Sequence, residues 1–90
     1  MAERLVELYI SRTDACAVSR GAERTRRVAE AMTREGTPVR YLQSIFVPED
    51  ETCFFLYEAV SAEAVRKAAL GAALPFDRVA EAVAERRELT

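Results

Sequence analysis

Two alternating segments joined by a short acidic turn constrain the fold of this chain more than any other feature. Val39–Val47 and Thr52–Ala59 are rich in aromatic and β-branched residues, which are typical of strands. The Pro-Glu-Asp-Glu sequence between them has the length of a hairpin loop. We therefore predict an antiparallel hairpin, and its register places Tyr41 opposite Glu58.

The segments on either side of this hairpin predict two helices and two further strands. Arg4–Ile10 alternates and predicts a strand, and Gly21–Glu35 has apolar residues at helical spacing. Ser61 can cap a second helix that runs to about Ala72. The remaining tail is ambiguous, because its composition favours a helix while its alternation favours a strand. We expect Arg78–Glu85 to be a strand, because it would cover an open edge of the sheet.

The resulting order is β-α-β-β-α-β, which is the ferredoxin-like plan of the α+β class. The 90 residues form a single domain, residues 1–90, with a thin core. Two helices are expected on one face of a four-stranded antiparallel sheet, so the other face is left open.

The alternation of side chains separates the two faces of this sheet. One set is apolar, with members such as Val6, Leu8 and Phe55, and is expected beneath the helices. The other set mixes large apolar side chains with two carboxylates, an amide and two phenols. It consists of Leu5, Glu7, Tyr9, Tyr41, Gln43, Ile45, Phe54, Leu56 and Glu58.

An exposed patch of this kind is unusual in soluble monomers, so we predict that a second copy of the chain covers it. A cavity between two such sheets would combine apolar walls with polar groups, as ligand sites do. The predicted ligand-binding residues are Tyr9, Tyr41, Gln43, Phe54 and Leu56. The alternative is that Glu7 and Glu58 are solvated or paired with Arg40 or Lys67, and that the tyrosines are ordinary interface residues.

Charge and composition narrow the class of partner. The net charge of −2 gives no reason to expect nucleic acid or an anionic membrane as a partner. The two cysteines form no CxxC pair, the amino terminus lacks the layout of a signal peptide, and no apolar run approaches a membrane span. We therefore expect a cytoplasmic protein. The sequence also lacks a phosphate-binding glycine loop and any histidine-assisted nucleophile, and we expect no cofactor.

Several stretches resemble a known family, most specifically "FLYEAVSAEAVRKAA" from Phe55 and "LPFDRVAE" from Leu74, with "VRYLQS" from Val39 and a weaker match at Leu5–Glu7. They are similar to small proteins of a domain-of-unknown-function family typified by an actinobacterial nickel-binding, nickel-responsive protein. The resemblance implies a ferredoxin-like fold, a dimer formed through the sheets and a site on that face, with Glu58 as its best-matched residue.

The chain departs from this family at the positions that would hold a metal. The resemblance implies tryptophan at the position of Tyr41 and histidine at those of Gln43 and Ala68, whereas this sequence contains no histidine. Nickel favours imidazole nitrogen, so nickel binding is not carried over and we expect no metal site.

Three functions remain open. The first is a binding protein that holds a small organic ligand in the cavity of the dimer. The second is a cofactor-independent isomerase or cyclase in which Glu58 and Glu7 act as general acid and base. The third is a structural or regulatory dimer without a ligand. We favour the binding protein, because no pair of side chains has roles as acid and base that the sequence dictates.

Overall fold

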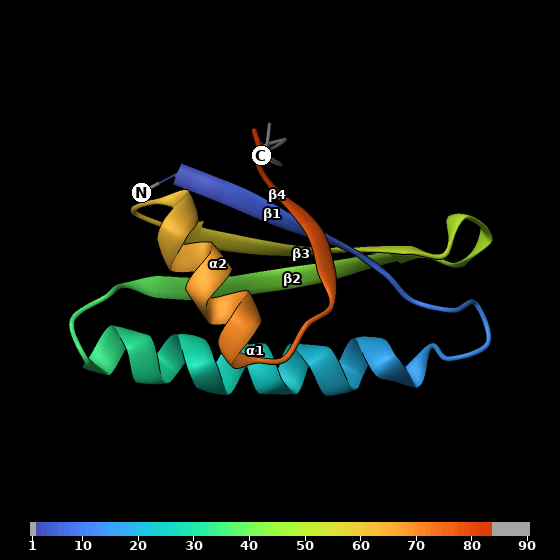
Figure 1. Ribbon diagram of the computed structural model, residues 1–90, viewed down its shortest axis with the longest axis horizontal. Coiled ribbons are helices and arrows are strands. Elements are labelled where there is room, and N and C mark those ends of the chain that lie inside the picture. Colours follow the sequence, from blue (N-terminus) through green and yellow to red (C-terminus); the bar gives the residue numbers. More distant parts are fainter. Residues whose placement is uncertain (1, 84–90) are drawn as a thin grey trace, which may run out of the picture.

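The computed structural model describes residues 2–83 and has the predicted ferredoxin-like order of elements. The elements are β1 (Ala2–Tyr9), α1 (Cys16–Arg34), β2 (Val39–Val47), a single 3-10 turn (Pro48–Asp50), β3 (Thr52–Ala59), α2 (Ala62–Gly71) and β4 (Phe76–Glu81). The strands form one sheet in the order β2-β3-β1-β4, with all neighbours antiparallel. In Figure 1, α2 crosses in front of this sheet and α1 runs along β2.

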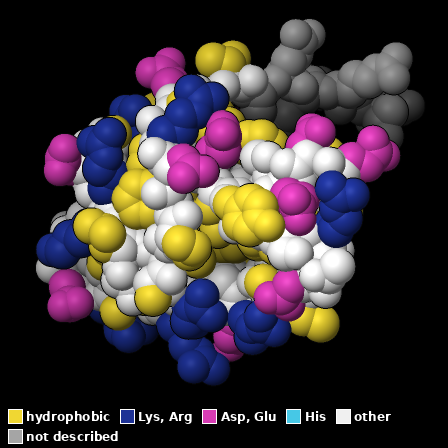
Figure 2. Space-filling model, turned by 45° about the vertical axis from the view of Figure 1, so that its right-hand side comes forward, with side chains coloured by type: hydrophobic (Ala, Val, Ile, Leu, Met, Phe, Trp, Pro, Cys, Tyr) yellow, Lys and Arg dark blue, Asp and Glu magenta, His cyan; other side chains and the backbone are white. Residues whose placement is uncertain are grey.

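The core lies between the sheet and the two helices. Phe55 and Tyr57 project from β3 toward α1 and are fully buried. Gly21 allows α1 to come close, because a Cβ atom at this position would lie 3.0 Å from the ring of Phe55. The hydroxyl groups of Thr25 and Tyr57 form a buried hydrogen bond that joins α1 to β3. Charged side chains of both signs are spread over the surface (Figure 2).

The start of α2 and the end of α1 have local causes, whereas the start of α1 does not. The hydroxyl of Ser61 accepts a hydrogen bond from the backbone N–H of Ala64 at 3.2 Å, which confirms the predicted cap of α2. Helix α1 begins at Cys16, five residues before the predicted start, and Ala15 at its N-cap makes no side-chain hydrogen bond. The sequence therefore carries no capping signal at the true start. Helix α1 ends just before Gly36, whose φ of +101° favours glycine.

The fourth strand was predicted correctly in kind but not in extent. It covers Phe76–Glu81 and pairs with β1, whereas Arg78–Glu85 was expected. Residues 84 and 85 lie outside the described residues. Strand β1 spans Ala2–Tyr9 and so ends one residue earlier than predicted.

The predicted pairing of Tyr41 with Glu58 is wrong. Tyr41 lies opposite Tyr57, because the register between β2 and β3 shifts between Tyr41 and Gln43. Leu42 is the extra residue of this β-bulge, and an extra residue reverses the alternation of everything before it. Beyond the bulge, toward the hairpin turn, the register is as predicted.

The bulge moves the Tyr41 side chain to the face that the helices cover. Its ring centre lies 5.9 Å from that of Phe55 and 6.0 Å from that of Tyr57. The guanidinium of Arg26 on α1 lies 5.8 Å from the centre of the same ring, and the Tyr41 hydroxyl is hydrogen-bonded to that of Ser44. Tyr41 is therefore part of the contact between α1 and the sheet.

Candidate functional site

The face of the sheet that points away from the core is the candidate site, and we call it the open face. The strand register and the alternating burial of β3 define its members. They are Glu3, Leu5, Glu7, Tyr9, Arg40, Gln43, Ile45, Val47, Thr52, Phe54, Leu56, Glu58, Arg78 and Ala80. Glu7 and Glu58 therefore share this face, as the alternation predicted.

Apolar side chains occupy the middle of the open face. Leu56 lies between Gln43 on β2 and Leu5 on β1, and the next row along the strands places Phe54 beside Ile45. The side chains of Leu5, Phe54 and Leu56 are half-buried, and Ile45 is 51% exposed. These residues form a continuous apolar strip across three strands.

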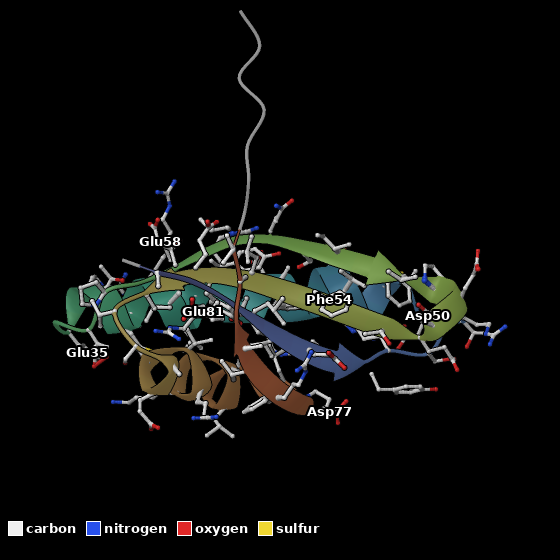
Figure 3. The ribbon with its side chains drawn as sticks, turned by 90° about the horizontal axis from the view of Figure 1, so that it is seen from above. Glu35, Asp50, Phe54, Glu58, Asp77 and Glu81 are labelled. Atoms are coloured by element: carbon white, nitrogen blue, oxygen red, sulfur yellow. The ribbon has the colours of Figure 1, made fainter. Side chains whose placement is uncertain are left out.

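Glu58 lies at one end of this strip, in a row of charged residues. Figure 3 shows its side chain on the side of the sheet away from α2. Glu3 lies directly opposite it on β1, and Arg40 lies opposite it on β2, with its Nη1 atom 4.0 Å from the Glu58 carboxylate. The Glu58 side chain is 33% exposed. It can therefore accept a hydrogen bond from a ligand that lies on Leu56.

Glu7 occupies a different part of the open face. It lies opposite Phe54, whereas Glu58 lies opposite Glu3, so the two carboxylates are offset by four residues along the strands. At about 3.4 Å per residue, this offset places them roughly 14 Å apart along the strands. The Nε atom of Arg78 donates a hydrogen bond to Glu7 at 3.1 Å. Glu7 and Glu58 therefore do not converge on one point within a chain.

Tyr9 lies at the hairpin end of the open face, beyond the apolar strip. It is 58% exposed, and its hydroxyl donates a hydrogen bond to Glu51 at 3.3 Å. The backbone N–H of Arg12 also donates to this carboxylate, at 2.9 Å, and this bond is the main reason that the pKa of Glu51 is lowered. Tyr9 therefore helps to hold the hairpin turn against the end of β1.

Burial disfavours the ionisation of two groups behind the open face. Burial raises the pKa of the Tyr57 hydroxyl to about 12 and that of the Cys53 thiol to about 11. The hydrogen bond from Thr25 partly opposes the effect on the Tyr57 pKa. Both groups are neutral at physiological pH and point into the core, so neither offers a nucleophile to a ligand on the open face.

The side chains present do not fit a nickel site. Gln43 lies on the open face, but Ala68 is fully buried on α2, so the two positions at which the resemblance implies histidine lie on opposite sides of the sheet. Within residues 2–83, no group of three or more histidine, cysteine, aspartate or glutamate residues is placed to hold a metal ion.

The structure thus brings together four of the predicted residues, Gln43, Phe54, Leu56 and Glu58. Glu7 lies beside Phe54, at the end of this group that is farther from Glu58. Tyr9 lies on the same face but beyond the group, and Tyr41 lies on the other face.

The sequence reasoning did not identify Glu3 or Arg78 as members of the site. The positions of both residues on the open face follow from the alternation and pairing of the strands. The spacing of Glu3 from Glu7 places both on one face, and the pairing of β4 with β1 sets Arg78 opposite Glu7.

In the part of the chain that the structure describes, neither helix has the length and apolar character that crossing a membrane requires.

The comparisons with known proteins agree with this fold. The crystal structure of SCO4226 from Streptomyces coelicolor A3(2) superimposes with a TM-score of 0.73 and 19% sequence identity, covering 94% of this chain and all of the other. No curated protein matches the sequence. The model of the SCO4226-like family, described as "Nickel responsive protein SCO4226-like", matches residues 9–82. The chain therefore belongs to the SCO4226-like family of nickel-responsive proteins.

Proposed function

We propose that this protein is a homodimer whose two open faces enclose a site for a small organic ligand. The observation that carries the proposal is the apolar strip around Leu56, which no helix among residues 2–83 covers. A second copy of the chain can cover this strip in a symmetric dimer, in which both copies bury the same apolar surface. Gln43 and Glu58 border the strip and supply the polar groups that would orient a ligand.

An organic ligand is favoured over nickel because of the donors available. The open face offers carboxylates and an amide but no imidazole or thiolate, and these donors suit hydrogen bonding to a ligand better than they suit nickel.

Binding without turnover is favoured over proton-transfer catalysis. A general acid and a general base must reach the same substrate. The offset of Glu7 from Glu58, about 14 Å at 3.4 Å per strand residue, separates the two groups within a chain. Each also lies beside an arginine, Arg78 or Arg40 respectively.

The dimer can be tested with Leu56→Asp, measured by light scattering coupled to gel filtration. Each interface would bury two uncompensated carboxylates, so the dissociation constant should rise by at least about a hundredfold. Leu70→Asp is the matched control, because Leu70 is 68% exposed on α2, away from the open face. A monomeric wild type, or dissociation by the control instead, would contradict the proposal.

The ligand class can be tested with two probes. Indole, titrated into the 15N-labelled protein, should shift the backbone amide signals of Gln43 and Leu56, and the Leu56→Asp monomer should lose this response. A dimer that gives no response would be an interaction module without a ligand. Nickel chloride, titrated by calorimetry, should give no tight stoichiometric binding, and tight binding by the wild type would refute our interpretation of the donor set.

A further inference from the structure

A concave site lies on the helix side of the sheet, and we call it the loop cleft. It forms where the end of β1 and the loop that follows it meet the first turns of α1 and the connection from α2 to β4, and its volume is about 340 Å³. This volume is at the small end of the range for ligand sites. In Figure 2, which turns the hairpin side of the molecule forward, hydrophobic side chains gather at the centre of the face with charged side chains around them.

The apolar part of the loop cleft is continuous with the hydrophobic core. Leu8, Ile10 and Leu74 line it, and each is at most 6% exposed, so they also belong to the hydrophobic core. Ala17, on the first turn of α1, adds a small side chain and leaves space above them. A hydrocarbon group placed here would displace water from apolar surface without requiring the core to move.

The two charged side chains at the rim of the loop cleft, Asp14 and Arg24, differ in how many of their hydrogen-bonding groups already have partners. The carboxylate of Asp14 already accepts two hydrogen bonds from Nη2 of Arg20, at 3.1 and 3.3 Å. Arg24 uses only its Nε atom, which donates to the backbone carbonyl of Ala72 at 2.8 Å. Within residues 2–83, the two Nη groups of Arg24 have no hydrogen-bond partner. These two positively charged Nη groups of Arg24 can therefore donate hydrogen bonds to a ligand at the rim.

The bond to Ala72 also orients Arg24. It fixes the guanidinium between α1 and the connection to β4, which is the wall of the loop cleft. An arginine held in this way loses less side-chain entropy when it binds an anion, and its planar donors match the two oxygens of a carboxylate.

We propose that the loop cleft binds a small carboxylic acid with an apolar tail. The tail lies on Leu8, Ile10 and Leu74, and the carboxylate accepts hydrogen bonds from Arg24. The site does not depend on the proposed dimer, because Leu8, Ile10 and Leu74, on which the tail lies, are buried on the helix side of the sheet, although Tyr9 of the open face also lines the cleft.

The proposal can be tested by titrating sodium octanoate into the 15N-labelled full-length protein. We expect the amide signals of residues 8–17 and of Leu74 to shift, with a dissociation constant of about 0.1–1 mM. Octanol, which has the chain without the charge, should bind at least about tenfold more weakly than octanoate. Acetate, which has the charge without the chain, should also bind at least about tenfold more weakly.

Two variants assign the roles of charge and shape. Arg24→Gln should weaken octanoate binding by about tenfold or more, because it removes the charge-assisted hydrogen bonds. The matched control is Arg27→Gln, on the same helix but paired with Glu23 outside the cleft, and its affinity should stay within about twofold of the wild type. Ala17→Leu fills the cleft without touching Arg24 and should abolish binding.

Three results would each overturn the proposal. They are the absence of any octanoate response, equal binding of octanol and octanoate, and signal shifts confined to the open face around Leu56. An unchanged affinity in Ala17→Leu would place the octanoate elsewhere, even if Arg24→Gln proved too unstable to measure.

Discussion

Replacing Tyr57 by phenylalanine should destabilise the protein, although it removes a single oxygen atom. Tyr57 and Thr25 are both fully buried, and their hydroxyl groups are hydrogen-bonded to each other. The phenylalanine variant leaves the Thr25 hydroxyl buried without this partner, which costs about 1–3 kcal/mol. A chain of this length has a free energy of unfolding of roughly 5–13 kcal/mol, so the loss is a large share of the total.

The expected loss converts directly into a measurable shift. With a slope of about 1.5 kcal/mol per molar urea, Tyr57→Phe should lower the unfolding midpoint by about 0.7–2 M. The double variant Thr25→Val/Tyr57→Phe removes both hydroxyl groups and should recover most of the stability, because no buried polar group is left unpaired. All variants should be compared at one protein concentration, because association also contributes to apparent stability.

Tyr9→Phe is the matched control, since the hydroxyl of Tyr9 is bonded to Glu51 at the surface. Its free energy of unfolding should stay within about 0.5 kcal/mol of the wild type. Two results would refute the reasoning. One is a loss of stability in Tyr57→Phe as small as that in the control, and the other is a double variant whose loss of stability equals the sum of those measured for Thr25→Val and Tyr57→Phe alone.

Three further predictions concern the cysteines, alkaline pH and the end of α1. In the native protein, a thiol reagent such as dithionitrobenzoate should modify Cys16, which is exposed, and should reach Cys53 only in denaturant; rapid modification of both thiols would contradict the buried placement of Cys53. The raised pKa values of Cys53, about 11, and Tyr57, about 12, mean that the unfolded chain loses these protons first. The contribution of these two groups to stability should therefore be constant below about pH 9 and should fall above it by up to about 1.4 kcal/mol per pH unit for each group, as urea titrations at increasing alkaline pH can show, and a flat profile from about pH 9 to pH 11 would be inconsistent with this. Gly36→Ala should cost about 1 kcal/mol because of the positive φ of Gly36, and an unchanged thermal midpoint would show that the turn adapts.

The parts of the fold that were predicted correctly are those that depend on local signals. The hairpin between β2 and β3 follows from two alternating segments and a short turn, and pairs such as Ile45 with Phe54 follow from that turn. The cap at Ser61 is a property of one side chain and the helix that it begins. Each of these features needs only neighbouring residues, so a single sequence contains the information.

The parts that were missed depend on contacts between distant segments. The start of α1 at Cys16 lacks a side-chain cap, so packing on the sheet fixes it rather than a local signal. Strand β4 was predicted in kind, but it begins at Phe76 and not at Arg78, because its pairing with β1 extends to Phe76 opposite Leu8. The bulge at Leu42 leaves no mark in the residue types around it, because Tyr41 and Gln43 satisfy simple alternation equally well.

The bulge at Leu42 also limits how a metal centre could be engineered into this protein. A histidine introduced at position 43 would join Leu56 and Glu58 on the outer surface of the sheet, whereas one at position 41 would be buried against α1. The two positions lie only two residues apart, yet their side chains can never chelate the same ion. A designer should therefore choose donors from positions 43, 45, 56 and 58, and leave the aromatic ring at 41 to anchor the helix.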